Sequence, residues 1–250
     1  MTYFVALLLI FALYLGSVSA HVYVKSWKTT SYSDFQPGQK EWKLQDTAYR
    51  RASDTIGWVG SKFLTRNKAI VRAGGKVILN LEGDTGRGYP HHHGHIQAYL
   101  GRCGSSPSAC QRFDASTASY FKIQEKKDGV IQLRKQYSSQ QGGDIWEVPI
   151  PKDVAAGSYI FRFEIITWGE SVQSEGFQDQ YYPSCGQLYV QSERKVPASH
   201  IPSIKLPGGY HDGNLPSSSN LPGPIVYSEY RRRRSLRSPS KSKTAKPPTL

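Results

Sequence analysis

The stretch Tyr159-Ile160-Phe161-Arg162-Phe163-Glu164-Ile165-Ile166 carries one of the clearest strand signals of this chain, and it directly follows Ala156-Gly157-Ser158. Runs of aromatic and β-branched residues bounded by glycine predict β-strands. Comparable signals occur at residues 21–24, 71–81, 96–100, 120–124, 146–151 and 187–190. Gly- and Pro-rich turns separate them, and helical periodicity is nearly absent. The sequence therefore predicts an all-β fold, an immunoglobulin/fibronectin-like β-sandwich with long loops.

Two segments refine this prediction. Trp146-Glu147-Val148-Pro149-Ile150-Pro151 predicts an edge strand, because proline cannot donate a hydrogen bond to a central ladder. Residues 25–62 are polar and aromatic, without a sustained period of either kind. They predict a long loop region on the scaffold, which is where functional residues usually lie.

The N-terminus has the pattern of a secretory signal peptide over residues 1–20. The apolar run Phe4–Leu15 is twelve residues long, too short to span a bilayer. Small residues follow, and cleavage after Ala20 would leave 230 residues beginning with His21. That length suits one large all-β domain or two small ones. The alternative interpretation is an uncleaved N-terminal anchor.

The net charge of +13 is unevenly distributed along the 250 residues. Residues 231–250 contribute +8, because they contain eight Arg or Lys residues and no Asp or Glu. The sequence predicts a main domain over residues 21–230 and a basic disordered tail over 231–250. The tail is either simply solvated or grips an anionic polymer or wall surface. A nucleic-acid partner is not expected, because the signal peptide indicates the secretory route.

The chain has three cysteines, too few for a fold built on disulfides. Cys103 and Cys110 are separated by six residues, so pairing them costs the least loop entropy. Cys185 is then left buried or free.

The segment Pro90-His91-His92-His93-Gly94-His95-Ile96 holds four of the chain's seven histidines. Such a cluster favours a metal site, and zinc is the generic metal for histidine ligands. The exposed N-terminal His21 changes this prediction, since its α-amine and imidazole can form one chelate ring. An all-nitrogen ligand set suits tetragonal Cu(II), which lies at the top of the Irving–Williams order.

A second segment, Asp179-Gln180-Tyr181-Tyr182-Pro183-Ser184-Cys185, places Gln180 and Tyr182 on the same side of an extended chain. The Gln180 amide and the Tyr182 hydroxyl could both face a metal or its bound oxygen species. An ordinary strand with a surface glutamine and a core tyrosine explains this pattern equally well.

Together, these motifs and Leu206-Pro207-Gly208-Gly209-Tyr210 resemble the fungal lytic polysaccharide monooxygenases of auxiliary activity family nine, over residues 21 to 230. The resemblance implies one copper ion held by a histidine brace of His21 and His92. It also implies that Tyr182 is the axial ligand and that Gln180 positions the oxygen species. Tyr210 and Tyr23 would lie on a flat face that binds substrate.

The chain departs from the family pattern at three places. His95 stands where family members usually have proline after the His-x-Gly motif. Family members carry a further histidine near the copper, in the loop before Gln-x-Tyr, but no histidine occurs here between His95 and His200. We hypothesise that His95 or Glu170 takes its role. The cysteine that commonly pairs with Cys185 is also absent around residues 63–67.

The resemblance implies a secreted, extracellular, copper-dependent monooxygenase that oxidatively cleaves β-1,4-glucan, such as cellulose. Its partners would be the polysaccharide, an external electron donor and dioxygen or hydrogen peroxide, and a monomer without a membrane span is expected. The alternative is a histidine-brace copper-binding protein without polysaccharide oxidation, for copper acquisition or cell-wall maintenance. A third interpretation is an extracellular β-sandwich that only binds a ligand. It would leave the order of His21, His92, Gln180 and Tyr182 as a coincidence.

Overall fold

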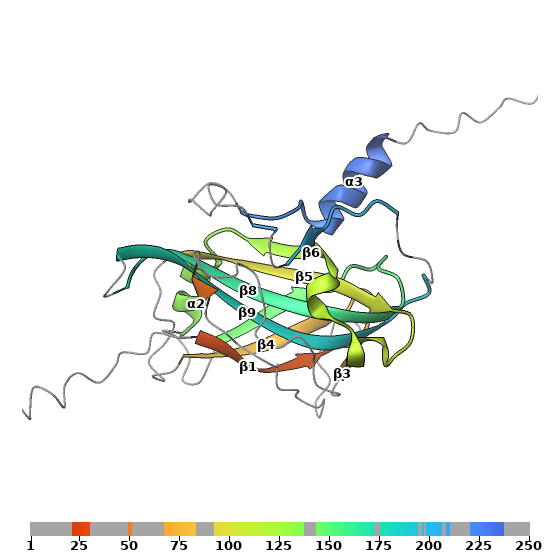
Figure 1. Cartoon of the computed structure of the whole chain (residues 1–250), viewed down its shortest axis with the longest axis horizontal. Coiled ribbons are helices and arrows are strands. Elements are labelled where there is room, and N and C mark those ends of the chain that lie inside the picture. The colour runs from red at the N-terminus through yellow and green to blue at the C-terminus, as the bar shows by residue number, and fades with distance from the viewer. Residues whose placement is uncertain are drawn as a thin grey trace, which may run out of the picture.

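The computed structural model of the chain contains two β-sheets packed face to face (Figure 1). It describes residues 22–30, 50–51, 68–83, 93–137, 144–172, 176–194, 197, 199–206, 209–210 and 221–237. The smaller sheet is antiparallel, in the order β1-β4-β7. Its strands are β1 (Val22–Thr29), β4 (Lys76–Gly83) and β7 (Asp144–Pro149). The prediction of an edge strand ending in proline is confirmed, because β7 lies at the border of this sheet.

The larger sheet has the order β10-β6-β5-β8-β9-β2, and β3 pairs with β9 in parallel. The long central strands are β5 (Gly94–Gly104), β8 (Gly157–Val172) and β9 (Gly176–Gln191). The others are β2 (Arg50–Arg51), β3 (Lys68–Arg72), β6 (Ser119–Lys126) and β10 (Ile204–Lys205). This arrangement confirms the predicted β-sandwich.

Side chains of β8 alternate between two buried layers. Tyr159, Phe161, Phe163 and Ile165 point into the main core between the sheets. There the ring of Phe161 stacks on Trp27 of β1, with centroids 5.5 Å apart. Ile160 and Ile166 point to the opposite face, which the segment containing Leu206 and Tyr210 covers. The larger sheet is therefore buried on both faces, which explains its nearly continuous apolar sequence.

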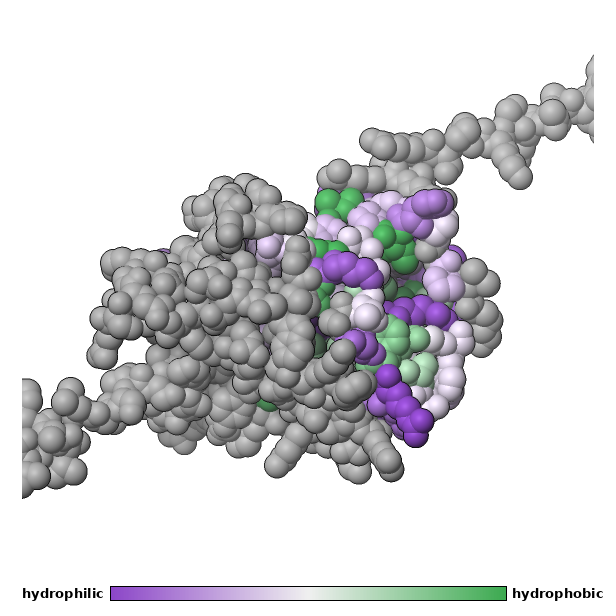
Figure 2. Space-filling model, viewed as in Figure 1, coloured by the Kyte–Doolittle hydropathy of each residue, from purple (hydrophilic) through white to green (hydrophobic). Residues whose placement is uncertain are grey.

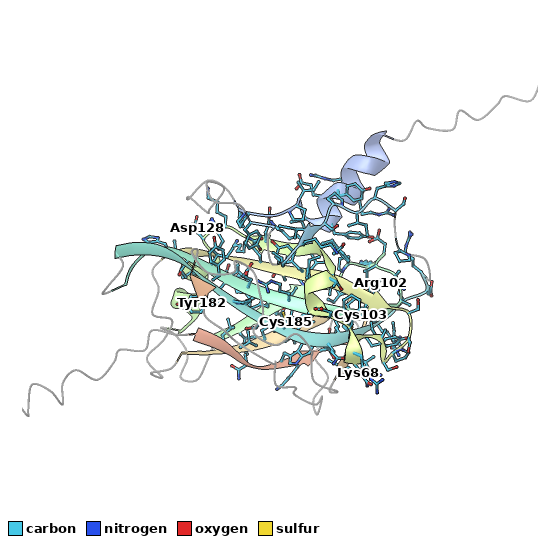
Figure 3. All side chains as sticks on the ribbon, viewed as in Figure 1. Lys68, Arg102, Cys103, Asp128, Tyr182 and Cys185 are labelled. Carbon is cyan, nitrogen blue, oxygen red and sulfur yellow. A yellow bond between two sulfur atoms is a disulfide. The ribbon has the colours of Figure 1, made fainter. Side chains whose placement is uncertain are left out.

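The disulfide between Cys103 and Cys110 is present, and Cys185 is a buried free cysteine on β9. Both observations confirm the predicted pairing. Figure 3 shows Cys185 near the middle of the sandwich and Cys103 farther from Tyr182. A short 3-10 turn, η1 (Ala109–Arg112), begins at the end of the loop that the disulfide closes, and a second, η2 (Ala115–Thr117), follows it.

Three sequence-based expectations need correction. β1 runs on to Thr29, and β2 lies within residues 25–62, so this region is not entirely loop. Helix α2 (Gly129–Tyr137) was not predicted. Residues 231–237 of the expected disordered tail belong instead to helix α3 (Tyr227–Arg237), because Tyr227 is buried against the core and Arg231 forms an ion pair with Asp153.

The described part of the surface in Figure 2 shows hydrophilic and hydrophobic side chains in small neighbouring groups. Among the described residues, no helix is long and apolar enough to cross a membrane.

Candidate metal centre

Three strands bring the predicted metal-site segments to one end of the sandwich. In the larger sheet, Gly94 at the start of β5 pairs with Thr167 of β8, and Thr167 pairs with Gln180 of β9. Neighbouring strands lie about 4.8 Å apart, so the backbones of Gly94 and Gln180 are about 10 Å apart. β1 begins at the same end, at the left of Figure 1.

Tyr182 faces the inside of the sandwich at this end. It pairs with Ile165 across β8 and β9, is 6% exposed and belongs to the main core. Tyr181 points to the outer face of the sheet, as strand alternation requires. The Tyr182 ring is thus directed toward the sheet that contains β1, and Figure 3 shows it near the end where β1 begins. A ring in this position is shielded from bulk water.

Gly94 explains why a glycine follows the histidine run. A Cβ at this position would lie 2.5 Å from the carbonyl oxygen of Ile166 and 2.7 Å from Cγ2 of Val130. Only glycine lets β5 approach β8 so closely at its first residue. The glycine thereby fixes where the chain enters the sheet, two residues after His92.

His21 and His92 themselves lie outside the described residues, one residue before β1 and two residues before β5. Gln180 lies on β9, paired with Thr167 and Arg51, and Tyr23 lies on β1 opposite Glu82. Their side chains also fall outside the description. Among the described residues, no group of three His, Cys, Asp or Glu side chains is arranged to hold a metal ion.

The structure corrects the expectation for Tyr210. Its side chain is 5% exposed, and its ring lies 5.9 Å from that of Tyr181 on the covered face of the larger sheet. Its hydroxyl donates to Oε2 of Glu164 at 2.6 Å and lies 2.9 Å from the Tyr99 hydroxyl. Tyr210 therefore does not offer its ring to a flat substrate; it holds the C-terminal segment onto the sheet.

The buried polar network around Glu164 was missed in the sequence. The Glu164 carboxylate also accepts a hydrogen bond from Nη2 of Arg162 at 2.5 Å, and both side chains are fully buried. The Tyr99 hydroxyl donates to Oε1 of Gln97 at 2.5 Å. The available signal was Arg162 and Glu164 alternating with apolar residues in a strand, which marks buried charges that require partners.

Burial controls the ionisation of this network. It raises the pKa of the Tyr99 and Tyr210 hydroxyls well above their usual range, and the Glu164 carboxylate raises both pKa values further. Burial alone would lower the pKa of the Arg162 guanidinium, but the attraction of Glu164, added to that of Cys185, Tyr210 and Tyr120, makes the net shift upward. Burial lowers the pKa of Lys122, although Glu125, which accepts its hydrogen bond at 2.8 Å, opposes the shift.

His95 occupies a structural position near the candidate centre. It is fully buried on β5 opposite Ile166, and its Nδ1 accepts the backbone N–H of Asp128 at 3.1 Å. Asp128 has a positive φ of 55°, so this contact supports a strained turn before α2. Glu170, the other proposed substitute for the missing histidine, lies on β8 opposite Gln178.

The architecture identifies an immunoglobulin-like β-sandwich protein. The sequence profile of Auxiliary Activity family 9 (formerly GH61) matches residues 21–221, which is most of the chain. The protein therefore belongs to this family.

The AA9 family lytic polysaccharide monooxygenase A of Gibberella zeae is 32% identical over 165 residues, 62% of this chain and 46% of that protein. The AA9 family lytic polysaccharide monooxygenase B of Heterobasidion irregulare is 26% identical over 257 residues, covering 90% and 99% of the two chains. The chain spans about half the length of several of the relatives that it matches.

Solved structures support the fold. HiLPMO9B has a TM-score of 0.57 at 23% identity, with 83% of this chain and 99% of that chain covered. A cellulose-active polysaccharide monooxygenase from M. thermophila has a TM-score of 0.58 at 24% identity, with the same coverage. At these identities the likeness establishes the β-sandwich alone.

Proposed function

We propose that the mature chain is a secreted, copper-dependent lytic polysaccharide monooxygenase that oxidatively cleaves β-1,4-glucan. The observation that carries this proposal is the position of Tyr182, buried and directed toward the sheet of β1, at the end where β1 and β5 begin. Family membership and the cellulose-active relative from M. thermophila support the activity and the substrate class.

The donor groups at this end fit copper. His21 would supply an α-amine and an imidazole, His92 a second imidazole and Tyr182 a phenol, which together suit Cu(II). The register supports such a set, because Gly94 and Gln180 lie two strands apart in one rung of the sheet. When bound, copper would supply the one-electron and oxygen chemistry that breaks the glycosidic link.

The chain's own residues would orient and protect this centre. Gly94 fixes the entry of the segment that carries His92, because no side chain fits there. The buried Tyr182 ring would exclude water from one side of the centre. The Gln180 amide, two residues before Tyr182 on the same strand, would donate a hydrogen bond to an oxygen ligand.

The test is incubation of the copper-loaded mature chain, which begins at His21, with ascorbate and amorphous cellulose. Oxidised oligosaccharides in the soluble fraction, detected by mass spectrometry, are the expected result. A chain with one extra residue before His21 and the variant H92A are matched controls. Both should lose copper binding and product formation together. Product formation that persists in either control would contradict this copper site.

A second candidate is a copper-binding protein of the same site without polysaccharide oxidation. One observation favours it, namely that the sequence has no histidine between His95 and His200. Copper binding by the wild-type chain that is lost in H92A, without oxidised products from any β-1,4-glucan, would select this candidate.

A further inference from the structure

A cavity of about 740 Å³ opens at the end of the sandwich opposite the candidate metal centre. The turn between β3 and β4, the turn between β7 and β8 and the chain at the end of β9 form its walls. Tyr182 and Gln191 are nine residues apart on β9, which places the cavity about 30 Å from the metal end. Three of its lining residues are cations, namely Arg72, Lys152 and Arg194. We call this feature the cationic cavity.

The positive charge of the cationic cavity is only partly neutralised. Asp153 and Glu193 also line it, but the Asp153 carboxylate accepts a hydrogen bond from Nε of Arg231 at 2.7 Å. Within the described part of the chain, no carboxylate forms an ion pair with Lys152 or Arg194. Two cationic groups are therefore available to an anion from solution.

Backbone hydrogen bonds hold the walls of the cavity together. The N–H of Ala156 donates to the carbonyl of Arg194 at 2.7 Å. The N–H of Ala73 donates to Gln191 at 2.8 Å, and that of Gly74 donates to Ile150 at 3.0 Å. These bonds link the segments that carry Arg72, Lys152 and Arg194, so the backbone that bears the cations is pre-organised.

Helix α3 extends the basic surface beside the cavity. Tyr227 anchors its first turn in the core, where its ring lies 5.3 Å from that of Phe121. Arg231, one turn later, joins the helix to Asp153. The helix then projects away from the sandwich (Figure 1). The Arg232 side chain on it is exposed. The ion pair of Arg231 with Asp153, a lining residue of the cavity, therefore places the start of α3 beside the cationic cavity.

We propose that the cationic cavity and α3 bind a carboxylated polysaccharide, a polyuronate. A guanidinium pairs with a carboxylate through two parallel hydrogen bonds, and the ammonium of Lys152 adds a point charge. A neutral glucan offers these cations no counter-charge. The choice of a polysaccharide among anionic polymers rests on the proposed function. Binding here would leave the metal end, about 30 Å away, free to act on a different polymer.

The probe is polygalacturonate, with its fully methyl-esterified form as the uncharged control of the same backbone. Calorimetric titration of the mature chain without copper or reductant measures binding alone, so this proposal can fail independently of the oxidation activity. We expect the wild type to bind polygalacturonate, more weakly at high salt, and not to bind the ester.

The variant K152Q/R194Q removes two charges and keeps most of each side-chain stem. It leaves the backbone hydrogen bonds of Arg194 intact. We expect its affinity for polygalacturonate to fall about tenfold, since two charge-assisted contacts are lost. The matched control K126Q/K127Q removes the same charge at the turn after β6 and should change affinity less than about twofold. R232Q on α3 is an independent variant that leaves the cavity untouched, and it should also weaken binding.

Three results would overturn the proposal. Equal losses in K152Q/R194Q and K126Q/K127Q would show attraction by net charge alone. Equal binding of the methyl ester would show that carboxylates are not recognised. Tighter binding of single-stranded DNA, lost in the same variant, would assign the region to nucleic acid. Oxidation of cellulose by K152Q/R194Q at the wild-type rate would show that the cationic cavity and the candidate metal centre act separately.

Discussion

The hydroxyl of Tyr210 donates a 2.6 Å hydrogen bond to Oε2 of Glu164, which joins the C-terminal segment to the middle of β8. The other oxygen of the same carboxylate accepts from Arg162. One buried carboxylate thus accepts hydrogen bonds both from the central sheet and from the segment that covers its outer face. We therefore expect both hydrogen bonds to contribute to the stability of the outer face.

Y210F should destabilise the fold by about 2 kcal/mol, because a hydrogen bond to a buried charged acceptor is lost. Denaturant unfolding at neutral pH measures the change. The matched control is Y159F, which removes a buried 2.8 Å hydrogen bond to the neutral carbonyl of Ala155. Its cost should be about 1 kcal/mol. A loss in Y210F no greater than that in Y159F would contradict the role of Glu164.

Stability should fall steeply as the pH rises above about 10. Burial raises the pKa of Tyr99 and Tyr210 in the folded state far above the ordinary tyrosine value of 10.0, so both hydroxyls ionise first in the unfolded chain. Their contribution is therefore complete below pH 10 and is lost above it, at about 1.4 kcal/mol per pH unit for each tyrosine. Lys122, whose pKa is lowered in the folded state, has the opposite effect. Its unfavourable contribution to folding stability disappears as the pH rises and the ammonium loses its proton.

The measurement is the unfolding free energy of the wild type and of Y99F/Y210F across the alkaline range. The double variant should start lower at neutral pH and show a shallower decline above pH 10. Parallel curves for the two proteins would disprove the assignment of the alkaline loss to these hydroxyls.

The sequence predicted the strands because their signals are local. Residues 159–166 and 187–190 are strand-like in any context, and the spacing of Cys103 and Cys110 favours a short disulfide loop. The prediction that Tyr210 lies on a substrate face was wrong, because a ring on a surface and a ring under a covering segment have the same local sequence. Only the long-range contact with Glu164 distinguishes them.

Helix α3 shows the same limit. Four consecutive arginines favour disorder by composition, and Tyr227 four residues earlier gave no local sign of its position in the core. The ion pair of Arg231 with Asp153 joins residues 78 positions apart, so no window of sequence contains it. For the metal site, the order of the motifs could be predicted, but the register that aligns Gly94 with Gln180 required the sheet.

E164Q should destabilise the fold by about 3–5 kcal/mol, since it leaves the guanidinium of Arg162 buried without a counter-charge. The matched control is E147Q, which breaks the exposed 2.7 Å ion pair with Lys76. Exposed pairs contribute about 0.2–1 kcal/mol, so this variant should lie close to the wild type. Thermal and denaturant unfolding of both variants give the comparison. Equal losses would mean that the Arg162–Glu164 pair is not desolvated.

G94A tests whether the entry of β5 positions the candidate metal centre. The added Cβ would meet the Ile166 carbonyl at 2.5 Å, and this backbone atom cannot move without breaking the pairing of β5 with β8. The start of β5, and with it the segment of His92, must therefore shift. We expect Cu(II) affinity to fall at least about tenfold, because metal sites depend on ligand geometry.

The control for this prediction is G104A at the other end of β5. There a Cβ would meet only the Ala109 side chain, at 3.0 Å, beside the disulfide loop. Each variant adds one methyl group to β5. A general loss of stability would therefore affect copper binding in both variants. Weaker copper binding in G94A alone, measured by calorimetric titration, would show that the glycine acts on the ligands. Unchanged affinity in G94A would mean that the histidine segment is positioned independently of β5.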